Sequence, residues 1–179
     1  MRSAAQAAPA RCWAWPKTCR WSPATIARLT SAIYGTVLAI ALIAAYSAEE
    51  DLDALVIAVA LLVTLCVFWL AHTQAELLAV RYAVAHPLTR EERRDALRHG
   101  WPMVEAGFPP ALGLLLGGAG LVKDTTAVSI ALAIGVAELA AWGIAVGRRE
   151  GLGTLGTIGA TAANVTLGLA VVGLKLLIH

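Results

Sequence analysis

The chain has 179 residues, of which 59% are apolar and only 15% are charged, and its mean hydropathy is +0.71. Soluble domains carry about a quarter charged residues, so this composition argues against a water-soluble globule and against a disordered chain. The net charge of +2 gives no indication of nucleic-acid binding, and no nucleic-acid partner is expected. The composition indicates an integral membrane protein, and its excess of arginine over lysine is typical of a high-GC bacterium.

Five apolar runs predict the fold class, an all-α transmembrane helical bundle with five spans. A helix needs about 20 residues to cross the hydrocarbon, and a backbone in lipid must satisfy its own hydrogen bonds, so runs of this length are expected to be helices. A basic leader that contains three tryptophans, residues 1–28, is expected to be poorly ordered in the cytoplasm. The transmembrane domain is 29–179, with spans at 29–47, 54–80, 101–122, 126–146 and 152–178.

The first run admits a second interpretation. A basic segment, an apolar core and the sequence Ala45-Tyr46-Ser47-Ala48 have the order of a cleavable signal peptide. The basic stretch is long for such a peptide and contains three tryptophans and three prolines. A retained first helix is therefore favoured over a cleaved one.

The middle of the chain departs from simple apolar runs. A short cytoplasmic surface helix is predicted near 88–99, because Thr89 and Glu92 have the spacing of a capping box. The third run contains Pro109-Pro110, and proline removes a backbone donor and clashes with the preceding turn. A kink is therefore expected at these prolines.

The distribution of basic residues predicts the orientation in the membrane. Cytoplasmic segments of membrane proteins carry the excess of lysine and arginine. The leader and every second connection hold twelve such residues, against one in the connections on the other side. This asymmetry predicts the inner membrane of a bacterium, with the N-terminus in the cytoplasm and the C-terminus outside. The lipid bilayer is the expected partner, and a homo-oligomer or a partner membrane subunit stays open.

Small residues at intervals of four predict the faces through which the helices pack, because they let backbones approach closely in lipid. The fourth run carries one continuous stripe of serine and alanine, and the third and fifth runs carry shorter stripes. The expected packing residues are Ser129, Ala133, Ala137, Ala141 and Ala145, then Gly113 and Gly117, then Gly156, Ala160, Asn164 and Gly168.

Ionisable residues inside the apolar runs are the candidate functional residues, because a charge at the membrane centre is costly and each one needs a reason. We expect them to form a polar site in the cytoplasmic half of the bilayer. Its predicted members are His72, Glu76, Glu105 and Glu138, with Tyr34 and Asn164 as neutral contributors.

Two members of this polar site are predicted to lie at the same depth. His72 comes nine residues before Arg81, and Glu138 comes ten residues before Arg148. At the helical rise both lie about 13–15 Å from the cytoplasmic arginines, so we expect the two side chains to approach each other. The structural alternative is that each group pairs across helices and only fixes their register.

Catalytic, cofactor-binding and metal-binding motifs are not found in the sequence. There is no Gly-rich phosphate loop, no His-x-x-x-His pair and no Ser/His/Asp set. Cys12, Cys19 and Cys66 do not have metal-site spacing, and they contain no Cys-x-x-Cys pair. No catalytic residue, cofactor or metal is predicted, and an enzyme is the least favoured class.

Four residues in or next to the first two predicted helices form a pattern. Arg28 stands just before the first helix, Gly35 lies within it, and Trp69 and His72 form a Trp-x-x-His motif late in the second helix. They resemble the opening of the lysosomal and bacterial potassium channels that carry an Arg…Phe-Ser-Asp motif. The resemblance covers residues 28–80 and implies potassium selectivity, although Ala32-Ile33-Tyr34 stand in place of the Phe-Ser-Asp signature. In general character the chain is similar to small integral membrane proteins of high-GC bacteria.

Two function classes follow from these observations. The first is a small cation or proton channel or transporter subunit, with the polar site on its path. The second is a non-transporting structural or accessory subunit of a membrane complex, held together by its small-residue stripes. Composition does not separate the two classes, whereas a flux assay does.

Overall fold

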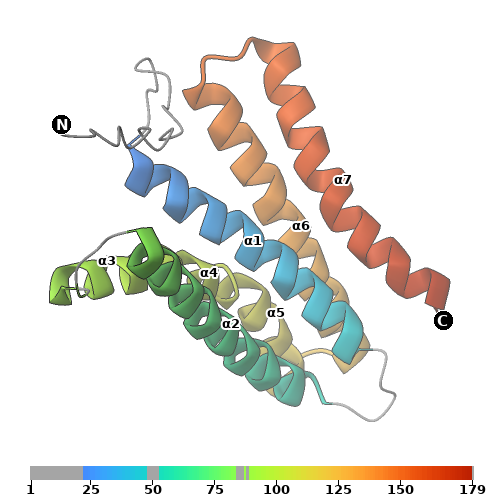
Figure 1. The fold of residues 1–179 in the computed structure, drawn as a ribbon. Helices are drawn as coiled ribbons and strands as arrows, with labels where there is room; N and C mark the ends of the chain where they lie inside the picture. Colours follow the sequence, from blue (N-terminus) through green and yellow to red (C-terminus); the bar gives the residue numbers. More distant parts are fainter. Residues whose placement is uncertain (1–21, 48–52, 84–86, 88, 179) are drawn as a thin grey trace, which may run out of the picture.

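The protein is a bundle of helices in the computed structural model, which describes residues 22–47, 53–83, 87 and 89–178 (Figure 1). The predicted leader lies outside the described residues as far as residue 21. All regular elements in the described part are helices, which confirms the all-α bundle. They are α1 (Pro23–Tyr46), α2 (Ala54–Ala83), α3 (Arg90–Gly100), α4 (Pro102–Glu105), α5 (Phe108–Gly118), α6 (Asp124–Arg149) and α7 (Thr154–Ile178).

Four of these helices, α1, α2, α6 and α7, are long and apolar enough to cross a membrane. In Figure 1 the start of α1 and the end of α7 lie at opposite ends of the bundle. This is the arrangement that an odd number of passes produces, so the chain must make one more pass between α2 and α6.

The predicted span 101–122 supplies this pass, but it is not one helix. It consists of α4, a turn at Ala106-Gly107, and α5, which at 11 residues is too short to cross alone. The break precedes Pro109-Pro110 instead of falling on them, because a proline in the first turn of a helix loses no hydrogen bond. Five predicted spans thus become four full-length helices and one broken pass, α4–α5.

Helix α1 begins at Pro23, six residues before the predicted start at residue 29. The Ser22 side chain accepts a hydrogen bond from the Thr25 backbone N–H at 3.1 Å, and Pro23 occupies the first turn, where its missing donor costs nothing. The extra turns carry Arg28 into the helix. They therefore place a charged side chain on an element that packs into the bundle.

The hydrophobic core lies between α1, α2, α5 and α6. Its largest fully buried members are aliphatic, namely Ile43, Ile57, Leu61, Leu65 and Leu114. Helix α1 also packs against α4 and α7, so it contacts both sides of the bundle. Helix α1 is thus a central member of the bundle.

The packing face of α6 differs from the predicted one. The predicted stripe is exposed along its whole length, at Ser129, Ala133, Ala137, Ala141 and Ala145. The buried face is offset from it by two residues and includes Ala131, Gly135, Leu139, Gly143 and Gly147. Glycine decides the face because it allows a closer approach than alanine: a Cβ added to Gly143 would lie 2.5 Å from the Thr161 Cα of α7.

The predicted packing residues of α5, in contrast, are confirmed. Gly113 and Gly117 are both buried. A Cβ added to Gly113 would lie 3.1 Å from the Ala131 Cα, and one added to Gly117 would lie 2.7 Å from the Ala127 Cβ. The broken pass is therefore held against α6 by backbone contact along its apolar half.

Helix α3 is the predicted surface helix, and its capping box is present. The Thr89 hydroxyl accepts from the Glu92 backbone N–H at 3.2 Å, while a Glu92 carboxylate oxygen accepts from the Thr89 backbone N–H at 2.7 Å. The other end of α3 is fastened to α2, because the Trp69 indole N–H donates to the Leu97 carbonyl at 3.1 Å. The rings of Trp69 and Trp101 also meet edge to face, with centroids 5.2 Å apart.

Replacing Thr89 with alanine is expected to destabilise the start of α3 by about 1 kcal/mol, the usual cost of a lost N-cap. Hydrogen exchange of the first α3 amides should become about fivefold faster. Thr89→Ser keeps the accepting hydroxyl and should exchange like the natural protein. Identical exchange in the alanine variant would show that the capping box contributes nothing to α3.

Candidate functional site

A cavity of about 540 Å³ lies between the first turns of α1, the short helix α4 and the second half of α6. Two carboxylates and two guanidiniums line it, together with one indole and several apolar side chains. The charged and aromatic lining residues are Arg28, Glu105, Glu138, Trp142 and Arg149. Two acidic and two basic side chains, contributed by three different helices, make this cavity the candidate functional site.

The wall formed by α4 depends on a close helix contact. A Cβ added to Gly35 of α1 would overlap the backbone of Met103, so α4 lies directly on α1 at this point. Met103 and Val104 are buried on that side, while Pro102 and Glu105 line the cavity. The turn that follows α4 then directs the chain into α5, leaving open space between α1 and α6.

Glu138 marks the inner end of the cavity. It lies within α6, 11 residues before the helix ends at Arg149, which is about 16 Å along the helix axis. Its Oε2 atom is buried and has no hydrogen-bond partner among the described residues. A buried polar atom without a hydrogen-bond partner lowers the free energy of unfolding, so the position of this carboxylate is not explained by stability.

The two arginines lie at the other end of the cavity, at a common height. Ile40 of α1 meets Gly135 of α6, where an added Cβ would lie 2.6 Å from the Ile40 Cγ1. From that level, Arg28 is about 18 Å and Arg149 about 21 Å towards the same end of the bundle, whereas Glu138 is only about 4–5 Å away. The cavity therefore has guanidiniums at its outer end and a carboxylate at its base.

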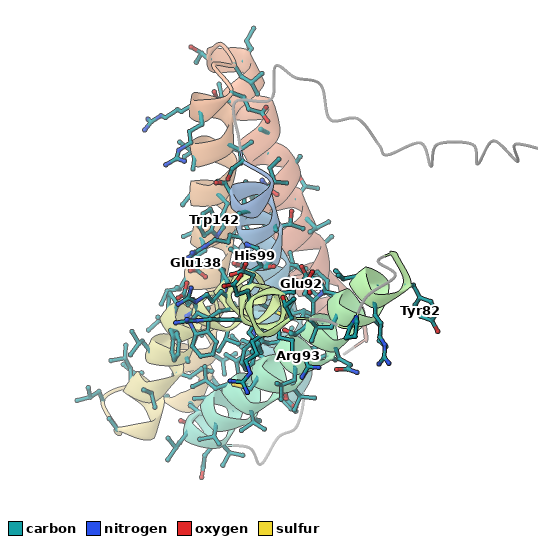
Figure 2. The ribbon with its side chains drawn as sticks, turned by 60° about the vertical axis from the view of Figure 1, so that its left-hand side comes forward. Tyr82, Glu92, Arg93, His99, Glu138 and Trp142 are labelled. Carbon is teal, nitrogen blue, oxygen red and sulfur yellow. The ribbon has the colours of Figure 1, made fainter. Side chains whose placement is uncertain are left out.

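Arg28 is not paired with the carboxylates of the cavity, since within the described residues no ion pair joins it to Glu105 or to Glu138. Trp142 lies one helical turn beyond Glu138 on α6, and Figure 2 shows the two residues one above the other along that helix. The base of the cavity thus offers a carboxylate and an aromatic ring on the same helix face.

The structure divides the predicted polar site. Glu105 and Glu138 line the cavity together. His72 is exposed and Glu76 is half-buried on α2, and neither lines the cavity with Glu138. Tyr34 is 48% exposed on α1, and the neutral contributor on α7, Asn164, is half-buried; neither belongs to the lining.

The direction of α2 explains this division. Its first half packs on the core, but its second half diverges, and Figure 2 shows Tyr82 far from α6 and α7. In this second half Thr73 is buried beside Gly100 at the α2–α3 junction. His72 lies at about the depth of Glu138 but not in the cavity, and this part of α2 packs against α3, where Gly100 lies beside Trp69 and Thr73.

Sequence reasoning assigned the two arginines of the cavity only to topology. Arg28 falls in the predicted leader, before the predicted start of the first helix, and Arg149 falls in a predicted connection. Arg28 lies near the start of α1 and Arg149 lies at the end of α6. Because these two helices are antiparallel, both arginines lie at the same end of the bundle. This shared position becomes a useful signal only once α1 and α6 are known to be neighbours.

Metal chemistry has no visible set of ligands in this part of the chain, since no group of three or more His, Cys, Asp or Glu side chains comes together among the described residues. No protein-family model, curated protein or solved structure matches the chain. The resemblance to potassium channels over residues 28–80 therefore stays a prediction. The fold and the site define a class, a helical membrane protein with a charged cavity inside its bundle.

Proposed function

We propose that this protein is a small membrane transport protein, or the transport subunit of a larger complex, for a proton or another positively charged solute. The observation that carries this proposal is the position of the Glu138 carboxylate. It belongs to a membrane-spanning helix and lines the cavity, and its Oε2 atom has no hydrogen-bond partner among the described residues. Ionisable groups at such positions mark ion pathways and proton relays more often than structural pairs. Glu105 would assist it as a second carboxylate in the same cavity.

The packing beyond the cavity favours a carrier over an open pore. Ile40 and Ile43 of α1 are fully buried between the cavity base and the far end of the bundle. A solute that reaches Glu138 from the arginine-lined end meets this apolar layer and cannot continue without a change in packing. The broken pass α4–α5 is the element suited to such a change, because a short turn at Ala106-Gly107 joins its two pieces.

Uptake by proteoliposomes tests the proposed function. The purified full chain is reconstituted in vesicles and exposed to gradients of protons, potassium, sodium and small organic ammonium ions. We expect saturable movement of at least one of these solutes, dependent on Glu138. Correctly folded protein that moves none of them would exclude transport by this chain alone.

The arginine asymmetry places the cavity mouth on the cytoplasmic side of a bacterial inner membrane in this proposal. Reporter domains fused after residue 50 and after residue 179 should then both report the outer face. A fusion in the α6–α7 connection, after Gly151, should report the cytoplasm. An inner-face signal at residue 179 would contradict the orientation and the odd number of passes together.

A second candidate function is a rigid, non-transporting subunit, and the glycine contacts of α6 favour it. Gly143 and Gly147 bring the α7 backbone close, with added Cβ atoms 2.5 Å from the Thr161 Cα and 2.8 Å from the Thr157 Cα. Such packing builds a stable scaffold without any need for a cavity. This function predicts that removing the Glu138 charge leaves the activity of the parent complex unchanged.

A further inference from the structure

The lining of the cavity changes in character from its base to its mouth. Trp142 lies about 6 Å from Glu138 towards the mouth, and Val146 lies about 12 Å from it, all three on α6 (Figure 2). Leu29 of α1 lies at the height of Val146, since both are equally far in sequence from the close contact of α1 with α6. A ligand that enters from the mouth therefore passes apolar walls, then an indole ring, and ends at a carboxylate.

The base of the cavity holds a hydrogen-bond acceptor that lacks a donor. The Glu138 Oε2 atom is buried and has no hydrogen-bond partner among the described residues. Trp142 carries an N–H group one helical turn away, but this group is not bonded to the atom. A ligand that brings its own N–H group to this oxygen supplies the missing hydrogen bond, and a positive charge on the ligand nitrogen strengthens it.

We propose that the cavity binds an organic ammonium ion that carries at least one N–H group. The N–H group donates to the Glu138 carboxylate, the charged nitrogen lies against the face of the Trp142 ring, and the organic part lies between the apolar walls near the mouth. This inference rests on the proposed function and deepens it, because it names the class of positively charged solute.

The lining suits an organic ion better than a bare metal cation. Bare cations such as calcium and potassium are held by roughly six or more oxygen atoms. Among the lining residues that the structure describes, only Thr25, Glu105 and Glu138 carry side-chain oxygens. The Thr25 hydroxyl lies in the first turn of α1 and already shares a hydrogen bond with the Ser22 hydroxyl at 2.8 Å. The volume of about 540 Å³, in contrast, falls within the usual range for small organic molecules.

The basic residues at the mouth do not prevent a cation from binding at the base. Arg28 is exposed and lies about 13 Å further along the helix axes than Glu138, beyond the Debye length of about 8 Å in physiological salt. Arg149, also at the mouth, is not a free charge. Glu105 of α4 is exposed and adds a second carboxylate to the lining. A cation at the base is therefore attracted by two carboxylates and only weakly repelled by a screened arginine.

Thermal melting of the full chain, purified in an uncharged detergent, tests this inference with matched probes. A ligand that binds only the folded state raises the melting temperature, so a concentration series gives its Kd. The tertiary dimethylhexylammonium ion is compared with the quaternary trimethylhexylammonium ion, with hexanol and with potassium chloride. We expect the tertiary ion to bind most tightly. The quaternary ion should bind about tenfold more weakly or worse, because it has lost the hydrogen bond to the carboxylate. Hexanol and potassium should give no shift at the same concentration.

Variants identify the groups that hold the probe. Glu138→Gln should raise the Kd of the tertiary ion about tenfold or more, as expected when the charge that accepts its hydrogen bond is lost. Glu76→Gln, on α2 outside the cavity, should leave the Kd unchanged and controls for uptake of the probe by detergent micelles. Trp142→Leu should raise the Kd about fivefold, whereas Trp142→Phe keeps an aromatic face and should change it by less than about twofold. The comparison of probes on the natural protein needs no variant, so it decides the matter even where a variant fails to fold.

Failure of this inference is distinguishable from failure of the proposed function. Quaternary and tertiary ions that bind equally well would overturn the hydrogen bond to Glu138, and equal binding of hexanol would overturn the ammonium ion altogether. If no ammonium ion binds while protons or potassium cross proteoliposomes, the inference is overturned and the proposed function stands. If no probe binds and no solute moves, both are overturned.

An ammonium group with N–H donors has two sources, a soluble solute and the headgroup of phosphatidylethanolamine. Nanodiscs made with phosphatidylethanolamine or with phosphatidylcholine separate them, because the two lipids have the same net charge but the second has no N–H group. Weaker binding of the tertiary ion in phosphatidylethanolamine supports the proposal with a lipid headgroup as the occupant. Equal binding in both nanodiscs supports it with a soluble solute.

Discussion

Replacing Gly35 with alanine is expected to destabilise the protein, although alanine is the better helix former. An added Cβ at this position overlaps the backbone of Met103, which is fully buried. Overpacking of this kind costs about 1–3 kcal/mol, and a clash with backbone belongs at the upper end of that range. The gain in helix propensity is at most about 1 kcal/mol, so the loss exceeds the gain. Thermal melting in detergent measures the difference.

Gly159 of α7 provides a matched control for Gly35. An added Cβ at Gly159 has no atom within 4 Å, so Gly159→Ala keeps the propensity gain without the clash. Its melting temperature should equal or slightly exceed that of the natural protein. Equal shifts for both variants would contradict the close contact between α1 and α4. Because this contact forms one wall of the cavity, Gly35→Ala should also weaken binding of any ligand there.

Hydropathy predicted the four long helices because each spans the hydrocarbon independently of the others. It did not predict the division of 101–122, since an apolar composition is compatible with one helix or with two. The decisive residues are Gly107 and the prolines that follow it. Gly107 lies so close to Leu65 of α2 that an added Cβ would overlap this side chain. The turn is therefore set by a neighbour that is distant in the sequence.

The stripe of α6 illustrates the same limit on a finer scale. Alanine and glycine both count as small, and the alanine stripe is the longer one in the sequence. The face of α6 that packs against neighbouring helices carries Gly135, Gly143 and Gly147, because helix backbones approach most closely where a residue has no Cβ. Weighting glycine above alanine would have identified this face from the sequence.

The candidate site was predictable in part, because intramembrane carboxylates are rare and need a reason. This argument selected Glu105 and Glu138, which the fold brings into one cavity. It also selected His72, for which depth was the only guide. Depth fixes the height of a residue along its helix but not the rotation of that helix or its neighbours. The pairing of α1 with α6, which adds Arg28 to the cavity, lies beyond such one-dimensional reasoning.

Glu138→Gln is expected to reduce the rate of solute uptake in proteoliposomes to about a tenth of the natural rate or less. The amide has nearly the same shape as the carboxylate but carries no charge, so it cannot compensate a cation in a membrane-spanning segment. Glu76→Gln is the matched control, because Glu76 is a half-buried glutamate on α2 outside the cavity. Its uptake should remain within about twofold of the natural protein, a barrier change of less than about 0.5 kcal/mol.

The stability of the Glu138 variants separates function from scaffold. The buried Oε2 atom has no hydrogen-bond partner among the residues that the structure describes, and an unsatisfied buried group of this kind costs about 1–3 kcal/mol. Glu138→Leu removes that cost and adds apolar contact, so its melting temperature should rise while uptake is lost. Opposite changes in stability and activity are typical of a residue kept for function at the expense of stability. A melting temperature that falls together with uptake would instead show that Glu138 holds the helices in register, and the second candidate function would then be favoured.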